Sequence, residues 1–170
     1  MTYVPDQLYA SIEASIPIVC TDFIMVRRDE AGRIAEVGLI ERDSPYGRVW
    51  CSVGGRIMRG ESIRAALLRH QQEALTGIEL QLPDDPQPRH VFQFFPEELG
   101  VSLPHPIGAD ARKHSVGLTF VVDVVGDPVV VDGGEALSVG FFAPDALPDA
   151  VWPGCAELFA TLLASEGVAV

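Results

Sequence analysis

The sequence has no long hydrophobic run and little positive charge. No apolar stretch approaches the roughly 20 residues that a helix needs to cross a bilayer, so we expect no membrane partner. Twelve Lys and Arg residues stand against 24 Asp and Glu residues, which gives a net charge of −12. An acidic surface repels nucleic acid, and it repels a phosphorylated ligand unless cations neutralise the binding site. The composition therefore predicts no nucleic-acid partner.

Cysteine is also scarce. Cys20, Cys51 and Cys155 are odd in number, widely spaced and without a CxxC pair. This pattern favours buried free thiols over a disulfide framework, a metal site or a nucleophile. The first residues show no basic segment followed by an apolar one, as a signal peptide would. We therefore expect a cytoplasmic protein.

The length and composition predict one domain over residues 1–170. Of these residues 48% are hydrophobic, and a chain of this length can form a sizeable core. Helices are predicted within 5–15, from Glu61 to a stop at Gly77, and near the C-terminus. Strands are predicted at 16–27, 34–42, 48–53, 90–95, 114–125, 128–131 and 137–142. Such a set indicates an α/β sandwich with a mixed sheet. Residues 96–112 are rich in Pro and Gly and predict a long loop, which at this length is often functional.

The loop-helix segment 54–77 carries the clearest chemical pattern. Glu61 follows Gly55 by six positions, and Arg69 follows Glu61 by eight. Arg69 and Glu73 are spaced i, i+4 on the predicted helix, so Arg69 can hold the Glu73 carboxylate. Arg69 can also reach Glu61 across the loop, and we expect that pair to be structural. Taken singly, the glycine indicates only a turn and Glu73 a solvated helix residue.

This spacing resembles the Nudix box, G-x5-E-x7-R-E-U-x-E-E-x-G-U, where U is aliphatic. Gly55, Glu61 and Arg69 match its first fixed points, and Glu73 matches the first of its paired glutamates. The remaining fixed points depart from the pattern at His70, Gln71, Ala74 and Gly77. We interpret His70 as a packed side chain at the edge of the core rather than a ligand or a base.

Within this superfamily the sequence is similar to GDP-mannose mannosyl hydrolases over roughly residues 8–148. The similarity lies in "PIVCTDFIMV", "LIERDSPYGRVWCSVGGRIMRGES", "KHSVGLTFVVDV" and "FFAPDALP". It implies a Nudix-type α/β/α sandwich with a mixed β-sheet. Those relatives bind one Mg²⁺ through a loop glycine carbonyl, a helix glutamate and a glutamine before the last strand. The resemblance therefore implies Gly55, Glu73 and Glu135 as metal ligands here, for Mg²⁺ or Mn²⁺.

The implied activity is hydrolysis of a nucleoside diphosphate linked to a sugar or another moiety. The resemblance implies a catalytic set of Glu73, Glu61 and Arg69, with Arg42 and Arg56 binding the substrate.

The general base is open, because Ala136 stands where the related hydrolases have a catalytic histidine. Glu73, or His105 or His114 beside the long loop, could take that role.

Two further expectations concern assembly and activity. A homodimer is expected, because members of the related group pair and the N-terminal segment is apolar. The alternative to an enzyme is a catalytically inactive Nudix-like domain that binds nucleotide sugars or regulates. The replaced glutamates of the box favour this alternative, whereas the retained Gly55, Glu61, Arg69 and Glu73 favour the enzyme.

Overall fold

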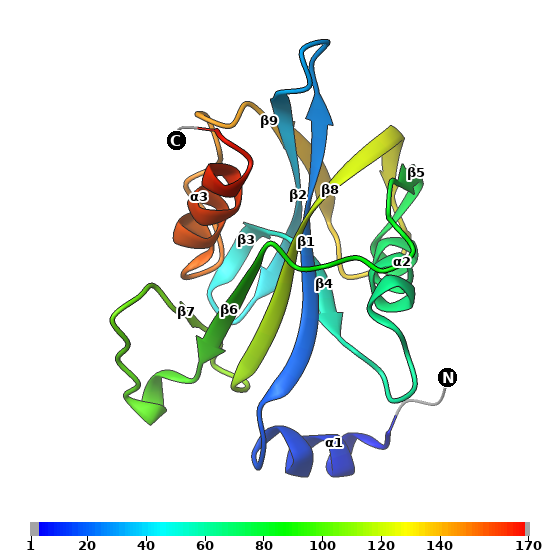
Figure 1. The fold of residues 1–170 in the computed structure, drawn as a ribbon. Coiled ribbons are helices and arrows are strands. Elements are labelled where there is room, and N and C mark those ends of the chain that lie inside the picture. Colours follow the sequence, from blue (N-terminus) through cyan, green and yellow to red (C-terminus); the bar gives the residue numbers. More distant parts are fainter. Residues whose placement is uncertain (1–3, 169–170) are drawn as a thin grey trace.

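The computed structural model describes residues 4–168, which form helices and strands around a curled sheet (Figure 1). The helices are α1 (Asp6–Glu13), α2 (Ile63–Ala74) and α3 (Cys155–Ser165), with a 3-10 helix η1 (Glu97–Leu99). The strands are β1 (Ile18–Arg28), β2 (Ile34–Ser44), β3 (Gly47–Cys51), β4 (Val53–Arg56), β5 (Leu75–Leu80), β6 (His90–Phe95), β7 (Gly108–Ala109), β8 (Ser115–Val130) and β9 (Ser138–Phe142).

The sheet is mixed and lies between helices. Its order is β3-β2-β1-β8-β6-β7, and β4, β5 and β9 pair with β1, β8 and β2 respectively. β1 runs parallel to β8 but antiparallel to β2 and β4. Helices α2 and α3 lie on opposite sides of the sheet (Figure 1). The predicted α/β/α sandwich with a mixed sheet is therefore confirmed.

Strand β1 is central because both of its faces are covered. Phe23, Ile24, Met25 and Val26 are consecutive and each is 0% exposed. A strand buried on both faces has a continuous apolar run instead of alternation, as this segment does. Its segment from Cys20 to Phe23 pairs with β4. This pairing brings residues 54–62, which we call the glycine loop and which start with Gly54 and Gly55 in β4, against the middle of the sheet.

The prediction of a helix from Glu61 to Gly77 was wrong at both ends. The helix begins after Ser62, whose hydroxyl accepts a hydrogen bond from the Ala65 N–H at 3.2 Å, so Glu61 belongs to the preceding loop. It ends at Ala74, and Gly77 lies within β5 at a φ of +77°. Tertiary pairing of β5 with β8 overrides the helical period, and Gly77 serves a bulge in that pairing.

The region predicted as separate strands at 114–125 and 128–131 is one strand, β8. Gly126, at a φ of +99°, carries the chain through the bulge opposite Gly77, so the strand continues across residues 126 and 127. The opposite error occurs at 48–53, which divides into β3 and β4. The predicted loop 96–112 contains η1 and β7.

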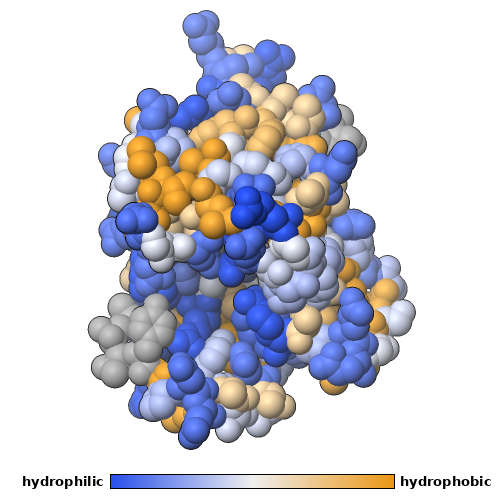
Figure 2. All heavy atoms as spheres, turned by 180° about the vertical axis from the view of Figure 1, so that it is seen from behind, coloured by the Kyte–Doolittle hydropathy of each residue, from blue (hydrophilic) through white to orange (hydrophobic). Residues whose placement is uncertain are grey.

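The surface mixes polar and apolar side chains. Seen from behind, hydrophobic side chains gather over the upper part of the molecule, whereas hydrophilic ones dominate below (Figure 2). Helix α1 has no buried residue and lies across the lower end of the sheet (Figure 1). Within residues 4–168, no helix combines the length and apolar character that crossing a bilayer requires.

Candidate active site

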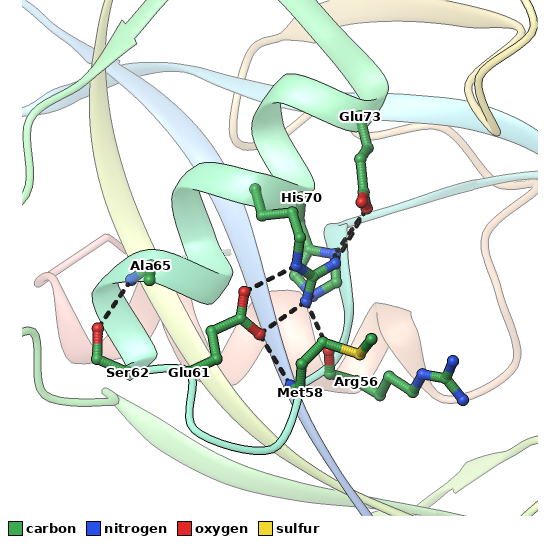
Figure 3. Close-up of polar contacts among 8 residues, drawn as sticks. Arg56, Met58, Glu61, Ser62, Ala65, His70 and Glu73 are labelled. Atoms are coloured by element: carbon green, nitrogen blue, oxygen red, sulfur yellow. Dashed lines mark hydrogen bonds and ion pairs between the residues drawn. The ribbon is translucent and has the colours of Figure 1, made fainter. Parts of the chain in front are cut away.

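Arg69 fastens the glycine loop to helix α2. Its Nε and Nη2 donate to the two carboxylate oxygens of Glu61 at 2.8 and 2.9 Å, and Nη2 also donates to the Arg56 carbonyl at 2.9 Å. Glu61 accepts a further hydrogen bond from the Met58 N–H at 2.8 Å, and its side chain is 0% exposed. Figure 3 shows how the loop closes on the Glu61 carboxylate. The expected Arg69–Glu61 pair is thus present, in a bidentate geometry that is among the stronger ion-pair arrangements.

The same arginine also holds the helix carboxylate of the site. Arg69 Nη1 lies 3.0 Å from Glu73 Oε2, one helical turn away.

Hydrogen bonding to Arg69 is the main cause that lowers the pKa of Glu61. Glu61 therefore stays ionised at neutral pH, as a structural anion needs to.

The structure brings the predicted metal ligands to one open cavity of about 460 Å³. Gly55, Glu73 and Glu135 all line it, together with Arg56, Arg69 and His70. Burial raises the pKa of Glu135, and the nearby Glu73 carboxylate raises it further. Two carboxylates that repel each other across a cavity favour a cation between them.

The donor set fits a divalent cation only in part. Glu73 is ion-paired with Arg69, and Glu135 with Arg42 at 2.6 Å. Across residues 4–168, no cluster of three or more His, Cys, Asp and Glu side chains is arranged to hold a metal. Mg²⁺ needs about six oxygens and commonly takes several from water and substrate phosphates. The residues therefore fit a cation that binds together with a diphosphate, not a preformed metal centre.

His70 is a packed residue, in agreement with its interpretation from the sequence. Its ring is 7% exposed and touches the loop so closely that a Cβ at Gly55 would lie 2.8 Å from Cε1. Burial lowers the pKa of His70, and the neighbouring Arg69 lowers it further. A neutral imidazole in this position supports the glycine loop.

A second pocket of about 190 Å³ opens from the same place, since Gly54, Gly55 and Glu135 line both cavities. Its wall carries the cations Arg42, Arg112 and Lys113, the last being the only lysine of the sequence. Arg112 makes a bidentate pair with Asp110, at 2.9 and 3.0 Å. These cations give an acidic protein a site that can accept an anion.

Asp22 lies in this pocket, and reasoning from the sequence did not single it out. An added Cβ at Gly54 would collide with Oδ1, and one at Gly117 would lie 2.9 Å from Oδ2. The glycines of two neighbouring strands thus leave room for the carboxylate. In the described part of the chain, no side chain or backbone group forms a hydrogen bond or ion pair with it. The signal in the sequence was a single acidic residue inside the apolar run of β1.

The electrostatics of Asp22 follow from its enclosure. Burial raises its pKa to about 7, with Lys113 acting in the opposite direction and Glu135 adding to the rise. The buried thiols nearby have a pKa of about 12 at both Cys20 and Cys51, again because of burial. The three cysteines are free and buried, as predicted.

The remaining predicted residues separate into two groups. Arg42 lines the inner pocket, and Arg56 lines the outer cavity with its guanidinium 3.9 Å from the ring centroid of Tyr9 in α1. His105 and His114 line neither cavity, and His114 stacks on Phe95 at 4.3 Å. The prediction that one of these two histidines supplies the base therefore gains no support from the cavity lining.

Comparison with solved structures identifies the fold of the chain. A crystal structure from Jonesia denitrificans, described as a possible asymmetric diadenosine tetraphosphate hydrolase, is 30% identical, with a TM-score of 0.76 over 90% of this chain and 96% of that one. A MutT Nudix hydrolase from Burkholderia pseudomallei is 22% identical, with a TM-score of 0.66 over 87% of this chain and 98% of that one. A UDP-X diphosphatase is 18% identical, with a TM-score of 0.59 over 98% of this chain and 72% of that one.

These neighbours define the fold: the chain has the Nudix fold. The 30% identical relative, described as a possible hydrolase, supports the predicted hydrolase. A family model described as Domain of unknown function (DUF4916) matches residues 2–158. The chain therefore belongs to the DUF4916 family. No curated protein matches the chain.

We expect Arg69→Ala to lower the free energy of unfolding by about 1–3 kcal/mol, because it leaves the enclosed Glu61 carboxylate without its partner. Urea denaturation at pH 7 measures this loss. Arg59→Ala is the control, because Arg59 is an exposed arginine of the same loop. An Arg69→Ala midpoint equal to that of the control would contradict the structural role.

We expect Asp22→Asn to stabilise the protein at pH 8 but not at pH 4. The native state raises the pKa of Asp22 from 3.8 to about 7. It therefore binds a proton that the unfolded chain releases, and the wild type loses stability as pH rises from about 4 to 7. Melting temperatures of both proteins across this range test the sign. A difference that does not grow with pH would show that the carboxylate is not desolvated.

Proposed function

We propose that this protein is a Nudix-type hydrolase of a nucleoside diphosphate linked to a sugar or a similar small polar group. The observation that supports this is the junction of the two cavities at Gly54, Gly55 and Glu135. The outer cavity offers carboxylates for a cation with its diphosphate. The inner pocket has room for the small group attached to that diphosphate.

In this proposal the carboxylates of Glu73 and Glu135 and the Gly55 carbonyl hold Mg²⁺ or Mn²⁺. The bound cation would polarise the phosphate and offset its charge. Arg42 and Arg56 bind the diphosphate oxygens, Arg42 by exchanging its ion pair with Glu135. Glu61 and Arg69 keep the glycine loop in position, so that Gly55 and Glu73 face the same cavity.

The lining of the inner pocket favours a polar group over an apolar one. Both acidic and basic side chains line it, and the Arg42 guanidinium lies 5.8 Å from the ring centroid of Trp152. Hydroxyl groups can both donate to carboxylates and accept from cations, so a sugar suits this lining. The similarity of the sequence to GDP-mannose mannosyl hydrolases supports the same class.

A dinucleoside polyphosphate is the second candidate substrate. The Jonesia denitrificans relative is described as a possible asymmetric diadenosine tetraphosphate hydrolase. Such a substrate would place a second nucleoside beyond the phosphates, where the pocket measures only about 190 Å³. The pocket size therefore ranks it below a nucleotide sugar.

The alternative to catalysis is a Nudix-like domain that binds nucleotide sugars or regulates without hydrolysing them. The replacement of box glutamates by His70 and Ala74, and of the catalytic histidine by Ala136, supports it. Glu73 and Glu135 facing one cavity support the enzyme, because a binding domain needs no pair of repelling carboxylates there.

We expect slow hydrolysis that depends on Mg²⁺ or Mn²⁺, and at least a tenfold loss of turnover in both Glu73→Gln and Glu135→Gln. Each substitution removes a negative charge that faces the cation. A screen of nucleotide sugars, dinucleoside polyphosphates and nucleoside triphosphates, scored by product chromatography, measures this. Glu79→Gln is the control, since Glu79 is exposed on β5 and lines neither cavity.

The binding-domain alternative makes a different prediction for the same proteins. It predicts that calorimetry detects nucleotide-sugar binding while no product forms with any cation. Turnover that is equal in the wild type and both glutamine variants would also remove the proposed site. Loss of Mg²⁺ binding in those variants, with a non-hydrolysable nucleotide sugar present, supports the ligand assignment independently of turnover.

We also expect a homodimer. Leu8 in α1 and Ile16 before β1 are 52% and 58% exposed, and an apolar surface of this kind is often covered by a partner. Sedimentation at micromolar concentration should show a species of twice 18.3 kDa. A monomer alone at that concentration would rule the dimer out.

A further inference from the structure

We propose that Asp22 is the proton acceptor of the hydrolytic reaction. Ala136 cannot fill this role. The proposal rests on the proposed function and deepens it. Ala136 is 4% exposed and has no titratable group. The base must therefore come from another element that lines the two cavities.

The other acidic side chains of the cavities are occupied or solvated. Glu73 pairs with Arg69, Glu135 with Arg42, and Asp110 with Arg112. Asp132 is exposed at the rim of the outer cavity. A carboxylate already neutralised by a guanidinium is a weak proton acceptor, because protonation breaks the ion pair.

The remaining titratable groups are unsuited for a different reason. Cys20 and Cys51, whose pKa is about 12, remain protonated thiols at neutral pH. His70 is enclosed between Arg69 and the glycine loop, so its ring cannot approach a water molecule in the inner pocket. Asp22 is the carboxylate that lines the inner pocket without a partner among residues 4–168.

Two glycines leave the space that the Asp22 carboxylate occupies. Gly54 on β4 and Gly117 on β8 flank its two oxygens, and any side chain at either position would displace them. Gly54 also belongs to the junction of the two cavities. A water molecule beside Asp22 would therefore lie between the inner pocket and the diphosphate.

The charged groups around Asp22 suit a base that works near neutral pH. Lys113 and Arg42 favour the carboxylate, whereas Glu135 and Asp110 disfavour it. Burial outweighs both and sets the pKa of Asp22 at about 7. A general base is most effective when its pKa lies near the working pH.

The only reactants of the proposed hydrolysis are the substrate, one water molecule and Asp22. Asp22 takes one proton from the water molecule, and the water oxygen forms a bond to phosphorus or to the attached carbon. The bond from that atom to the leaving oxygen breaks, and its electron pair stays on the leaving group. The neutral Asp22 carboxyl then returns its proton to solvent.

The first test is the pH profile of turnover on the nucleotide sugar that the screen finds active. Wild-type turnover should fall tenfold per pH unit on its acid limb, because the base must be unprotonated. Asp22→Asn should lower turnover at least a hundredfold and abolish this limb. Asp22→Ala should regain activity with added azide or formate, which a structural defect would not. Asp43→Asn is the control, since Asp43 lines neither cavity and its side chain is 75% exposed.

The second test uses Lys113, the only lysine of the sequence, and needs no turnover. Lysine-selective ¹³C labelling gives a single Cε signal, which should shift with a midpoint near pH 7 in the wild type and not in Asp22→Asn. Full turnover in Asp22→Asn with an unchanged acid limb would overturn the base assignment and leave the proposed function intact. A wild type that hydrolyses no substrate would overturn both.

Discussion

The bidentate ion pair between Arg69 and Glu61 is the interaction on which the rest of the site depends. Arg69 comes from helix α2 and Glu61 from the loop before it, so the pair sets the distance between loop and helix. The same guanidinium binds the Arg56 carbonyl and the Glu73 carboxylate. Gly55, one residue from that carbonyl, therefore faces the cavity only while Arg69 holds the loop.

Glycines around this ion pair allow polar side chains to approach the backbone closely. Gly55 accepts the His70 ring against it, and Gly54 and Gly117 leave space for Asp22. Without these gaps the carboxylate would have to leave the pocket. In the proposed function the cations of the inner pocket offset the net charge of −12, because an acidic surface repels a diphosphate.

The sequence was informative where a pattern was local. The spacing of Glu61 and Arg69 predicted their ion pair, and the continuous apolar run of β1 predicted a buried strand. It failed where pairing between segments far apart in the sequence decides the conformation. The residues of β5 form a strand instead of continuing helix α2 because they pair with β8. Asp22 was missed for the same reason, since Gly117, one of the glycines beside it, lies 95 positions away on the parallel strand β8.

The unpaired carboxylate also separates the enzyme from the binding-domain alternative on physical grounds. A buried carboxylate without a partner costs stability at neutral pH, and replacement by an amide would remove that cost. A domain that only binds would gain from a neutral side chain able to donate and accept hydrogen bonds. A proton acceptor needs the carboxylate in spite of its cost. Asp22 lines the inner pocket beside Gly54, which also lines the outer cavity, so in the proposed function this cost falls next to the reacting group.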